Sequence, residues 1–78
     1  MLSAACRTIG SNPEPCTFPF IYDGEEYDKC TAVDAQEAGS VWCATEVYDE
    51  DYNRTVIDGR WGNCNEGCPG ASKYNKLF

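Results

Sequence analysis

The sequence contains no histidine and only six lysine and arginine residues, against thirteen aspartate and glutamate residues. Without histidine the chain lacks the Ser-His and Cys-His pairs that activate many enzymatic nucleophiles, and the spacing of its acids singles out no catalytic pair, so we expect no enzyme activity. The net charge of −7 predicts an acidic surface that repels phosphate backbones, which excludes nucleic acid as a partner. No apolar run approaches the roughly 18 residues of a membrane span, so no transmembrane segment is expected.

Metal-binding patterns are missing as well. The cysteines form no C-x-x-C pair, and the acidic clusters at residues 23–28 and 49–51 lack the spacing of a calcium-binding EF-hand loop. We therefore expect neither a metal nor a cofactor, and we interpret the acidic clusters as solvated loops.

Cysteine, in contrast, is abundant, with six residues in a chain of 78. A domain of this size buries only about 60% of the surface that its unfolded chain exposes, so its core alone gives marginal stability. Disulfide bonds, each worth about 2–4 kcal/mol, compensate for a small core and persist in oxidising compartments. The composition therefore predicts a secreted, disulfide-rich extracellular domain, in which fifteen pairings are open to Cys6, Cys16, Cys30, Cys43, Cys64 and Cys68.

Short β-strands are the regular structure that the sequence favours. Residues 18–22, FPFIY, are aromatic and β-branched, and Asp23-Gly24 is the signal of a tight hairpin turn that leads into a second strand. Residues 41–45, VWCAT, predict a further strand, whereas residues 31–40 fit either a helical turn or a loop. No segment has the length and periodicity of a substantial helix, so we expect a small, mainly β, loop-rich fold.

Four stretches of the chain together resemble the fibronectin type II module: CTFPFIYDGEEYDKCT, WCAT, YDED and RWGNC. The resemblance runs from Cys16 to Cys64. It implies a core of two short antiparallel sheets over residues 16–64, between an N-terminal extension, 1–15, and a C-terminal extension, 65–78, that ends in a flexible tail. It further implies the disulfides Cys16–Cys43 and Cys30–Cys64, which leaves Cys6–Cys68 as an outer, kringle-like bridge.

The sequence departs from the family pattern at two places. Asn63 stands where the family usually has an aromatic residue, which we expect to trim one wall of the aromatic cluster. Residues 52–58 resemble an insertion, which we expect to bulge beside the binding surface. This insertion contains the sequon Asn53-Arg54-Thr55, so Asn53 is a candidate glycosylation site.

The aromatic residues are the candidate ligand-binding groups. We expect Phe18 and Phe20 to support the site from the core, while the resemblance implies that a second set of rings borders a shallow pocket: Tyr22, Tyr27, Trp42, Tyr48 and Trp61. Buried packing around the disulfides is an equally open role for the two tryptophans.

The resemblance implies two alternative ligands for these rings. In family members that bind collagen or gelatin, an extracellular-matrix protein supplies a proline-rich extended strand, which suits flat aromatic surfaces. In relatives from seminal plasma the rings hold the quaternary ammonium of a choline phospholipid (phosphorylcholine). Two other interpretations stay open: a secreted effector, such as a toxin or protease inhibitor, that acts through its acidic insertion, and an accessory module of a larger multidomain protease or receptor.

Overall fold

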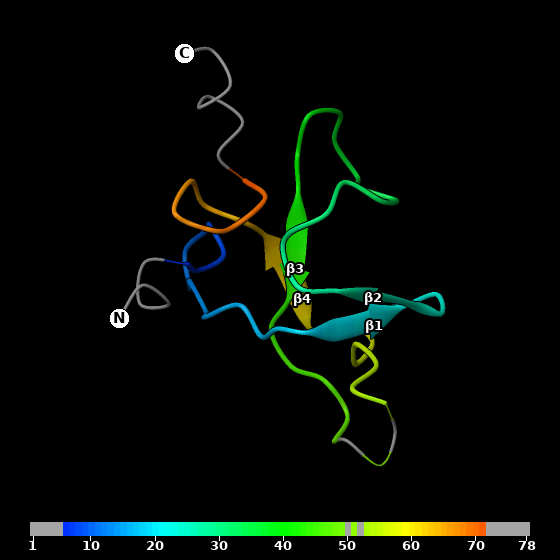
Figure 1. The fold of residues 1–78 in the computed structure, drawn as a ribbon. Helices are drawn as coiled ribbons and strands as arrows, with labels where there is room; N and C mark the ends of the chain where they lie inside the picture. The colour runs from blue at the N-terminus through cyan, green and yellow to red at the C-terminus, as the bar shows by residue number, and fades with distance from the viewer. Residues whose placement is uncertain (1–5, 50, 52, 72–78) are drawn as a thin grey trace.

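The computed structural model describes residues 6–49, 51 and 53–71 of the chain. Within these residues the regular elements are four strands, β1 (Phe20–Tyr22), β2 (Glu25–Tyr27), β3 (Trp42–Ala44) and β4 (Trp61–Asn63). They pair as two antiparallel two-stranded sheets, β1–β2 and β3–β4, which cross one another in Figure 1. The small, mainly β fold predicted from the sequence is therefore confirmed, and no helix in the described part of the chain is long and apolar enough to cross a membrane.

The first sheet is the hairpin that the Asp-Gly signal predicts. Phe20 pairs with Tyr27 and Tyr22 with Glu25, so only two residues connect the strands. Asp23 and Gly24 both have positive φ angles, 53° and 84°, as a type I′ turn requires. Asp tolerates this left-handed conformation better than most residues and Gly adopts it freely, so the turn sets the register of the hairpin.

The second sheet joins segments that lie far apart in the sequence. Trp42 of β3 pairs with Asn63 of β4, and on its other side Trp42 exchanges two backbone hydrogen bonds with Thr31. The residues that follow Thr31 form turns rather than a helical turn, which settles the open question about residues 31–40. At the middle of β4, a Cβ on Gly62 would lie 2.8 Å from Cγ2 of the buried Thr8, so the close approach of the N-terminal segment requires glycine there.

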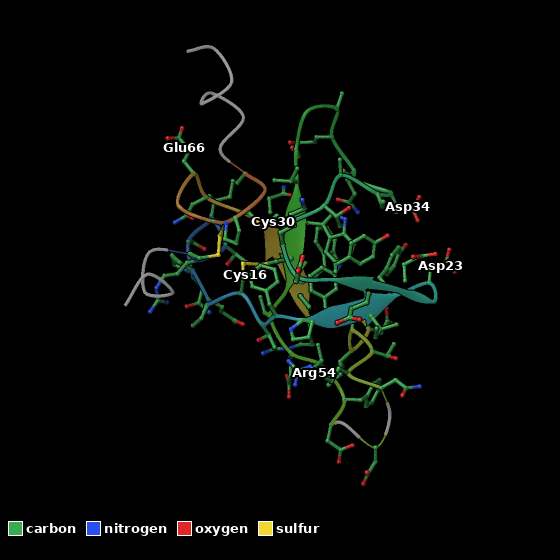
Figure 2. The ribbon with its side chains drawn as sticks, viewed as in Figure 1. Cys16, Asp23, Cys30, Asp34, Arg54 and Glu66 are labelled. Carbon is green, nitrogen blue, oxygen red and sulfur yellow. A yellow bond between two sulfur atoms is a disulfide. The ribbon has the colours of Figure 1, made fainter. Side chains whose placement is uncertain are left out.

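The disulfides form the centre of the core. Cys43 and Cys68 are fully buried beside Phe20, and Figure 2 shows the sulfur atoms between the two sheets and the terminal segments. Four of the sulfur atoms lie within 4.8 Å of one another, so the bridges are stacked together. The pairing agrees with the expectation in full: Cys6–Cys68, Cys16–Cys43 and Cys30–Cys64.

Both terminal extensions pack on this core where they are described. Thr8 forms a β-bridge with Cys64, and the backbone N–H of Ile9 donates to the carbonyl of Asn63. In the C-terminal extension Ala71 is buried, and a Cβ on Gly70 would lie 2.7 Å from the carbonyl oxygen of Cys30. The tail is expected after Pro69; its first residues, Gly70 and Ala71, are described, whereas residues 72–78 lie outside the described residues, as do residues 1–5 of the N-terminal extension.

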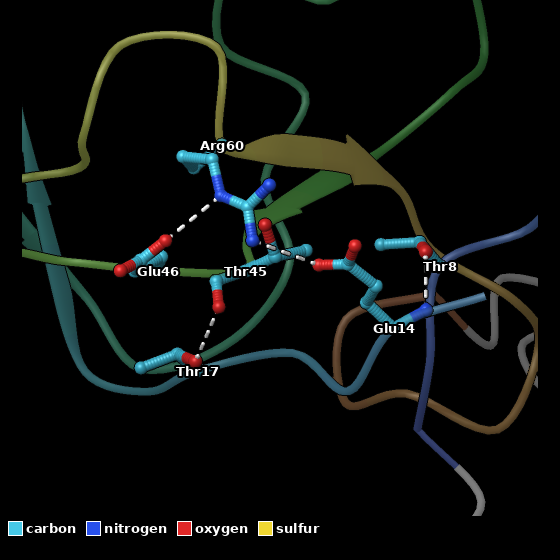
Figure 3. Close-up of polar contacts among 6 residues, drawn as sticks. All are labelled: Thr8, Glu14, Thr17, Thr45, Glu46 and Arg60. Carbon is cyan, nitrogen blue, oxygen red and sulfur yellow. Dashed lines mark hydrogen bonds and ion pairs between the residues drawn. The ribbon is translucent and has the colours of Figure 1, made fainter. Parts of the chain in front are cut away.

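An exposed arginine connects three segments on the surface in Figure 3. Nε of Arg60 donates to Glu46 at 2.9 Å, and its terminal nitrogen lies 3.5 Å from Glu14. Nearby, the Thr8 hydroxyl accepts a hydrogen bond from the backbone N–H of Glu14, and the Thr17 hydroxyl donates to the carbonyl of Thr45. Solvent-exposed ion pairs of this kind contribute at most about 1 kcal/mol each, so they align the segments more than they stabilise the fold.

The segment expected to bulge, residues 52–58, is attached to the first sheet by backbone pairing. Val47 pairs with Val56, and Ile21 of β1 forms a parallel bridge with Thr55. The guanidinium of Arg54 donates to the backbone carbonyls of Phe18 and Pro19, at 3.2 and 2.9 Å. These bonds hold the returning arm against β1, and Tyr52, the first residue of the segment expected to bulge, lies outside the described residues.

Candidate functional site

A continuous cluster of aromatic rings leads from the core to the surface. Side chains alternate along a strand, so Phe20 and Tyr22 lie on the same face of β1. Both pack on Trp42 of β3, with ring centroids 5.2 and 5.1 Å away, and Trp42 in turn meets Trp61 of β4 edge-to-face at 6.0 Å. Since Phe20 is fully buried and Trp61 is 38% exposed, the cluster becomes accessible where the two sheets meet.

A pocket of about 300 Å³ opens at this exposed end of the cluster. Its walls are formed by the two sheets, by the loop after β2 and by the arm that returns from the inserted loop. The lining residues are Tyr22, Asp34, Gln36, Trp42, Val56, Ile57, Asp58, Gly59 and Trp61.

Trp42 and Trp61 have different positions in the pocket. Trp42 is only 5% exposed, and its indole Nε1 donates to the carbonyl of Val33 at 2.7 Å. This hydrogen bond satisfies the one polar atom of the side chain and holds the ring as the rear wall. Trp61 is exposed enough to offer a face to a ligand. Trp42 therefore packs in the core, as one of the two open roles predicts, and it also lines the pocket.

Tyr22 and Asp34 meet at the edge of the pocket. The Tyr22 hydroxyl donates to Oδ2 of Asp34 at 2.7 Å. This hydrogen bond, together with desolvation and the negative charges of Asp34 and Asp23, raises the pKa of Tyr22 above its ordinary value of about 10. The phenol therefore stays protonated at neutral pH and holds the carboxylate of Asp34 in one orientation.

Not all of the candidate aromatic residues reach this pocket. Tyr48 is 47% exposed but lies outside the lining, and Tyr27 packs on Phe20 at 5.4 Å, also away from it. Phe18 stacks on Phe20 at 6.0 Å, at the base of the cluster. Asn63 lines a separate hollow with Ile9, so its difference from the family pattern leaves the walls of the pocket intact.

The sequence did not single out the polar side of the pocket. Asp34 and Gln36 belong to the loop after β2, and Asp58 is the last residue of the inserted segment 52–58. In the sequence, Asp58-Gly59 has the form of a turn signal without any binding motif, and the loop around Asp34 carries no binding motif either. Their approach to Trp42 is tertiary, and no local signal in the sequence predicts it.

A second hollow lies on the opposite face of β1. Ile21 alternates with Tyr22, so it points away from the aromatic pocket, and it lines this hollow together with Asn53 and Arg54. Asn53 is exposed there. Figure 2 shows Asp34 and Arg54 on opposite sides of the β1–β2 hairpin, so a glycan on Asn53 would leave the aromatic pocket open.

Among residues 6–49, 51 and 53–71, only sulfur atoms gather as a metal site would require. These belong to Cys16, Cys30, Cys64 and Cys68, all of which are in disulfides. A bridged sulfur is no thiolate ligand, so the group is structural.

Comparison with known proteins places this arrangement in a family. The profile of the fibronectin type II domain matches residues 16–64. The 72 kDa type IV collagenase of Gallus gallus is 43% identical over 63 residues, which are 77% of this chain and 8% of the collagenase. The C-type mannose receptor 2 of Homo sapiens is also 43% identical, over 54 residues, which are 69% of this chain and 3% of the receptor. The chain thus spans less than a tenth of these relatives, and no solved structure gave a significant match.

Proposed function

The chain belongs to the fibronectin type II family, and from this premise we propose that it is an extracellular, non-catalytic binding module for an extended, proline-rich strand of the collagen or gelatin type. One observation carries the proposal: the partly exposed Trp61 and the buried Trp42 form adjoining walls of a pocket at the end of a rigid aromatic cluster. A flat indole face beside a shallow pocket suits a polyproline helix, whose backbone is already extended and has no internal hydrogen bonds.

Pre-organisation supports this function. The hydrogen bond from Trp42 to Val33 and the contact with Phe20 hold the rear wall in place, and three disulfides hold the sheets that carry it. A site that is already ordered loses little conformational entropy when a ligand binds. The ligand strand is similarly stiff, so a small contact area gives measurable affinity.

The name of one relative is consistent with a collagen-type ligand. That relative is a type IV collagenase, whereas the other is named as a mannose receptor, and the matched region makes up 8% and 3% of their lengths. We propose that this chain likewise acts as an accessory part of a longer secreted or cell-surface protein. A pocket of about 300 Å³ is at the small end of ligand sites, so one copy binds weakly and gains affinity when other sites on the same protein engage the same ligand.

A titration with matched aromatic variants tests the proposal. The oxidised protein is titrated with a gelatin peptide while amide chemical shifts and tryptophan emission are followed. Trp61→Ala is expected to weaken binding about tenfold, since aromatic anchors commonly cost 1–2 kcal/mol or more when truncated. Tyr48→Ala is the matched control, because it removes an exposed ring outside the pocket, and it is expected to leave the affinity unchanged.

The same samples separate the alternatives. If the amide chemical shifts around Trp61 change with phosphorylcholine but not with gelatin, the ligand of the pocket is a choline headgroup rather than a proline-rich strand. If neither ligand binds and a biological activity depends on Asp49 and Asp51, the acidic loop is the working surface and the proposal is wrong. Equal losses for Trp61→Ala and Tyr48→Ala would likewise contradict the assignment of the pocket.

A further inference from the structure

We propose that the strand bound by this pocket carries a lysine or arginine, and that its cationic group lies against the indole faces between the carboxylates of Asp34 and Asp58. The inference rests on the proposed function and adds a specificity to it. It comes from the charge of the pocket, which the aromatic pattern of the sequence does not reveal.

The pocket lining contains two carboxylates and no lysine or arginine. Within the described residues, the one hydrogen bond that Asp34 makes is the bond from Tyr22, and neither Asp34 nor Asp58 forms an ion pair there; Asp58 also makes no hydrogen bond with these residues. Of the nearby basic side chains, Arg54 is bound to backbone carbonyls on the far face of β1, and Arg60 is paired with acidic residues elsewhere. The negative charge at the pocket is therefore not neutralised by the described part of the protein.

The geometry of Asp34 suits a ligand cation. Tyr22 occupies Oδ2 and holds the carboxylate at the edge of the pocket, which leaves the acceptor capacity of the other oxygen for a ligand. Trp42 and Trp61 add aromatic surface beside it. A cation over an aromatic face gains about 0.5–1 kcal/mol at exposed sites, and the methylene chain of a lysine or arginine covers apolar surface at the same time.

The same charges distinguish a protein strand from a lipid headgroup. Phosphorylcholine also offers a cation, but its phosphate would have to lie close to Asp34 and Asp58 with no basic residue in the lining to receive it. Like charges at short range oppose binding. A basic side chain on a proline-rich strand carries the positive charge alone, so it is the occupant that this lining favours.

Three peptides that differ in one residue test the inference. Each is the same Pro-Gly-rich strand, with a central lysine, norleucine or glutamate. Norleucine keeps the four-carbon aliphatic chain of lysine without its ammonium group. We expect the lysine peptide to bind about five- to twentyfold more tightly than the norleucine peptide, from the combined effect of the aromatic faces and exposed carboxylates, and the glutamate peptide to bind most weakly. The preference for lysine should also fall as salt concentration rises.

Charge-neutral variants identify the groups responsible. Asp34→Asn and Asp58→Asn are each expected to reduce the preference for lysine over norleucine, and the double variant should abolish it while the norleucine peptide binds as before. Asparagine keeps an acceptor for Tyr22 and tolerates the φ of 56° at Asp34. Asp23→Asn is the control, because it makes the same charge change at a turn outside the pocket lining.

The outcomes separate this inference from the proposed function. Equal binding of the lysine and norleucine peptides would overturn the cation site and leave the collagen-type function standing. A loss of preference in Asp23→Asn as large as in the pocket variants would show a general charge effect, which also overturns the site. If none of the three peptides binds, both the inference and the proposed function fail. Amide spectra of each variant confirm that the fold is retained.

Discussion

The outer disulfide gives the most quantitative prediction. Cys6–Cys68 spans 62 residues, and in the chain-entropy account a loop of that length is worth about 4.3 kcal/mol at 25 °C. The other bridges already restrict the unfolded chain. One short route follows the chain from Cys6 to Cys30, crosses the bridge to Cys64 and continues to Cys68, roughly 28 residues in all. For a loop of about 28 residues the value falls to about 3.6 kcal/mol.

The variant that tests this value replaces both Cys6 and Cys68 by alanine, so no free thiol remains. Its free energy of unfolding in urea is expected to fall by about 3–4 kcal/mol. The slope of that free energy against urea should rise, because the less restricted unfolded chain exposes more surface. Ile9→Ala is the control within the same segment: Ile9 is exposed, and surface changes usually stay within about 0.5 kcal/mol.

The result also decides how independent the core is. If residues 16–64 form a unit to which the extensions are added, the double variant keeps its amide spectrum over that range and its affinity for the gelatin peptide. A loss below about 1 kcal/mol, far under the entropic value, would refute the reasoning about the unfolded chain. The predicted loss of about 3–4 kcal/mol with an unchanged urea slope would instead trace the effect to native packing around Cys68, which is fully buried.

Three further predictions follow from single contacts. Gly62→Ala is expected to cost about 1–3 kcal/mol by overpacking against Thr8, and less in a Thr8→Ala background; an equal cost in both backgrounds would contradict the contact. Asp34→Ala is expected to lower the pKa of Tyr22 towards its ordinary value of about 10, followed by tyrosinate absorbance; an unchanged pKa would contradict the hydrogen-bond assignment. Because that pKa is raised in the folded state, the hydrogen bond stabilises the fold below about pH 10 and its contribution is lost as pH rises through the raised pKa. Expression in secreting cells should give a glycosylated chain whose apparent mass falls to that of Asn53→Gln after glycosidase treatment, with unchanged gelatin binding; weaker binding of the glycosylated form would place Asn53 near the pocket.

Much of the framework could be predicted from the sequence because its signals are local or carried by the cysteine pattern. The Asp23-Gly24 pair imposes the positive φ angles of a two-residue turn, and alternation along β1 then places Phe20 and Tyr22 on one face. The resemblance to a known family supplied the disulfide pairing, which composition alone left open among fifteen choices. The turn and the alternation depend on residues next to one another in the chain, and the disulfide pairing follows from the cysteine pattern of the family.

Only the tertiary structure decided which residues share the pocket. Tyr48 and Tyr27 are aromatic like Tyr22, yet they lie outside the pocket lining, whereas Asp34 and Asp58 belong to it although no motif marked them. Membership depends on how two sheets and two loops meet, and therefore on contacts between residues far apart in the sequence.

The inserted loop shows the same division. Its position as an insertion relative to the family pattern predicted a bulge beside the binding surface, and in the structure Arg54 binds the carbonyls of Phe18 and Pro19 while the returning arm pairs with Ile21. The two carbonyl acceptors lie more than thirty residues earlier in the chain than Arg54, so no local sequence pattern predicts these hydrogen bonds. The sequence by itself predicted the first hairpin, the strand around Trp42 and the aromatic residues available, and its resemblance to the family supplied the bridges. Long-range pairing determined the fourth strand, which aromatic residues line the pocket and which charges lie beside them.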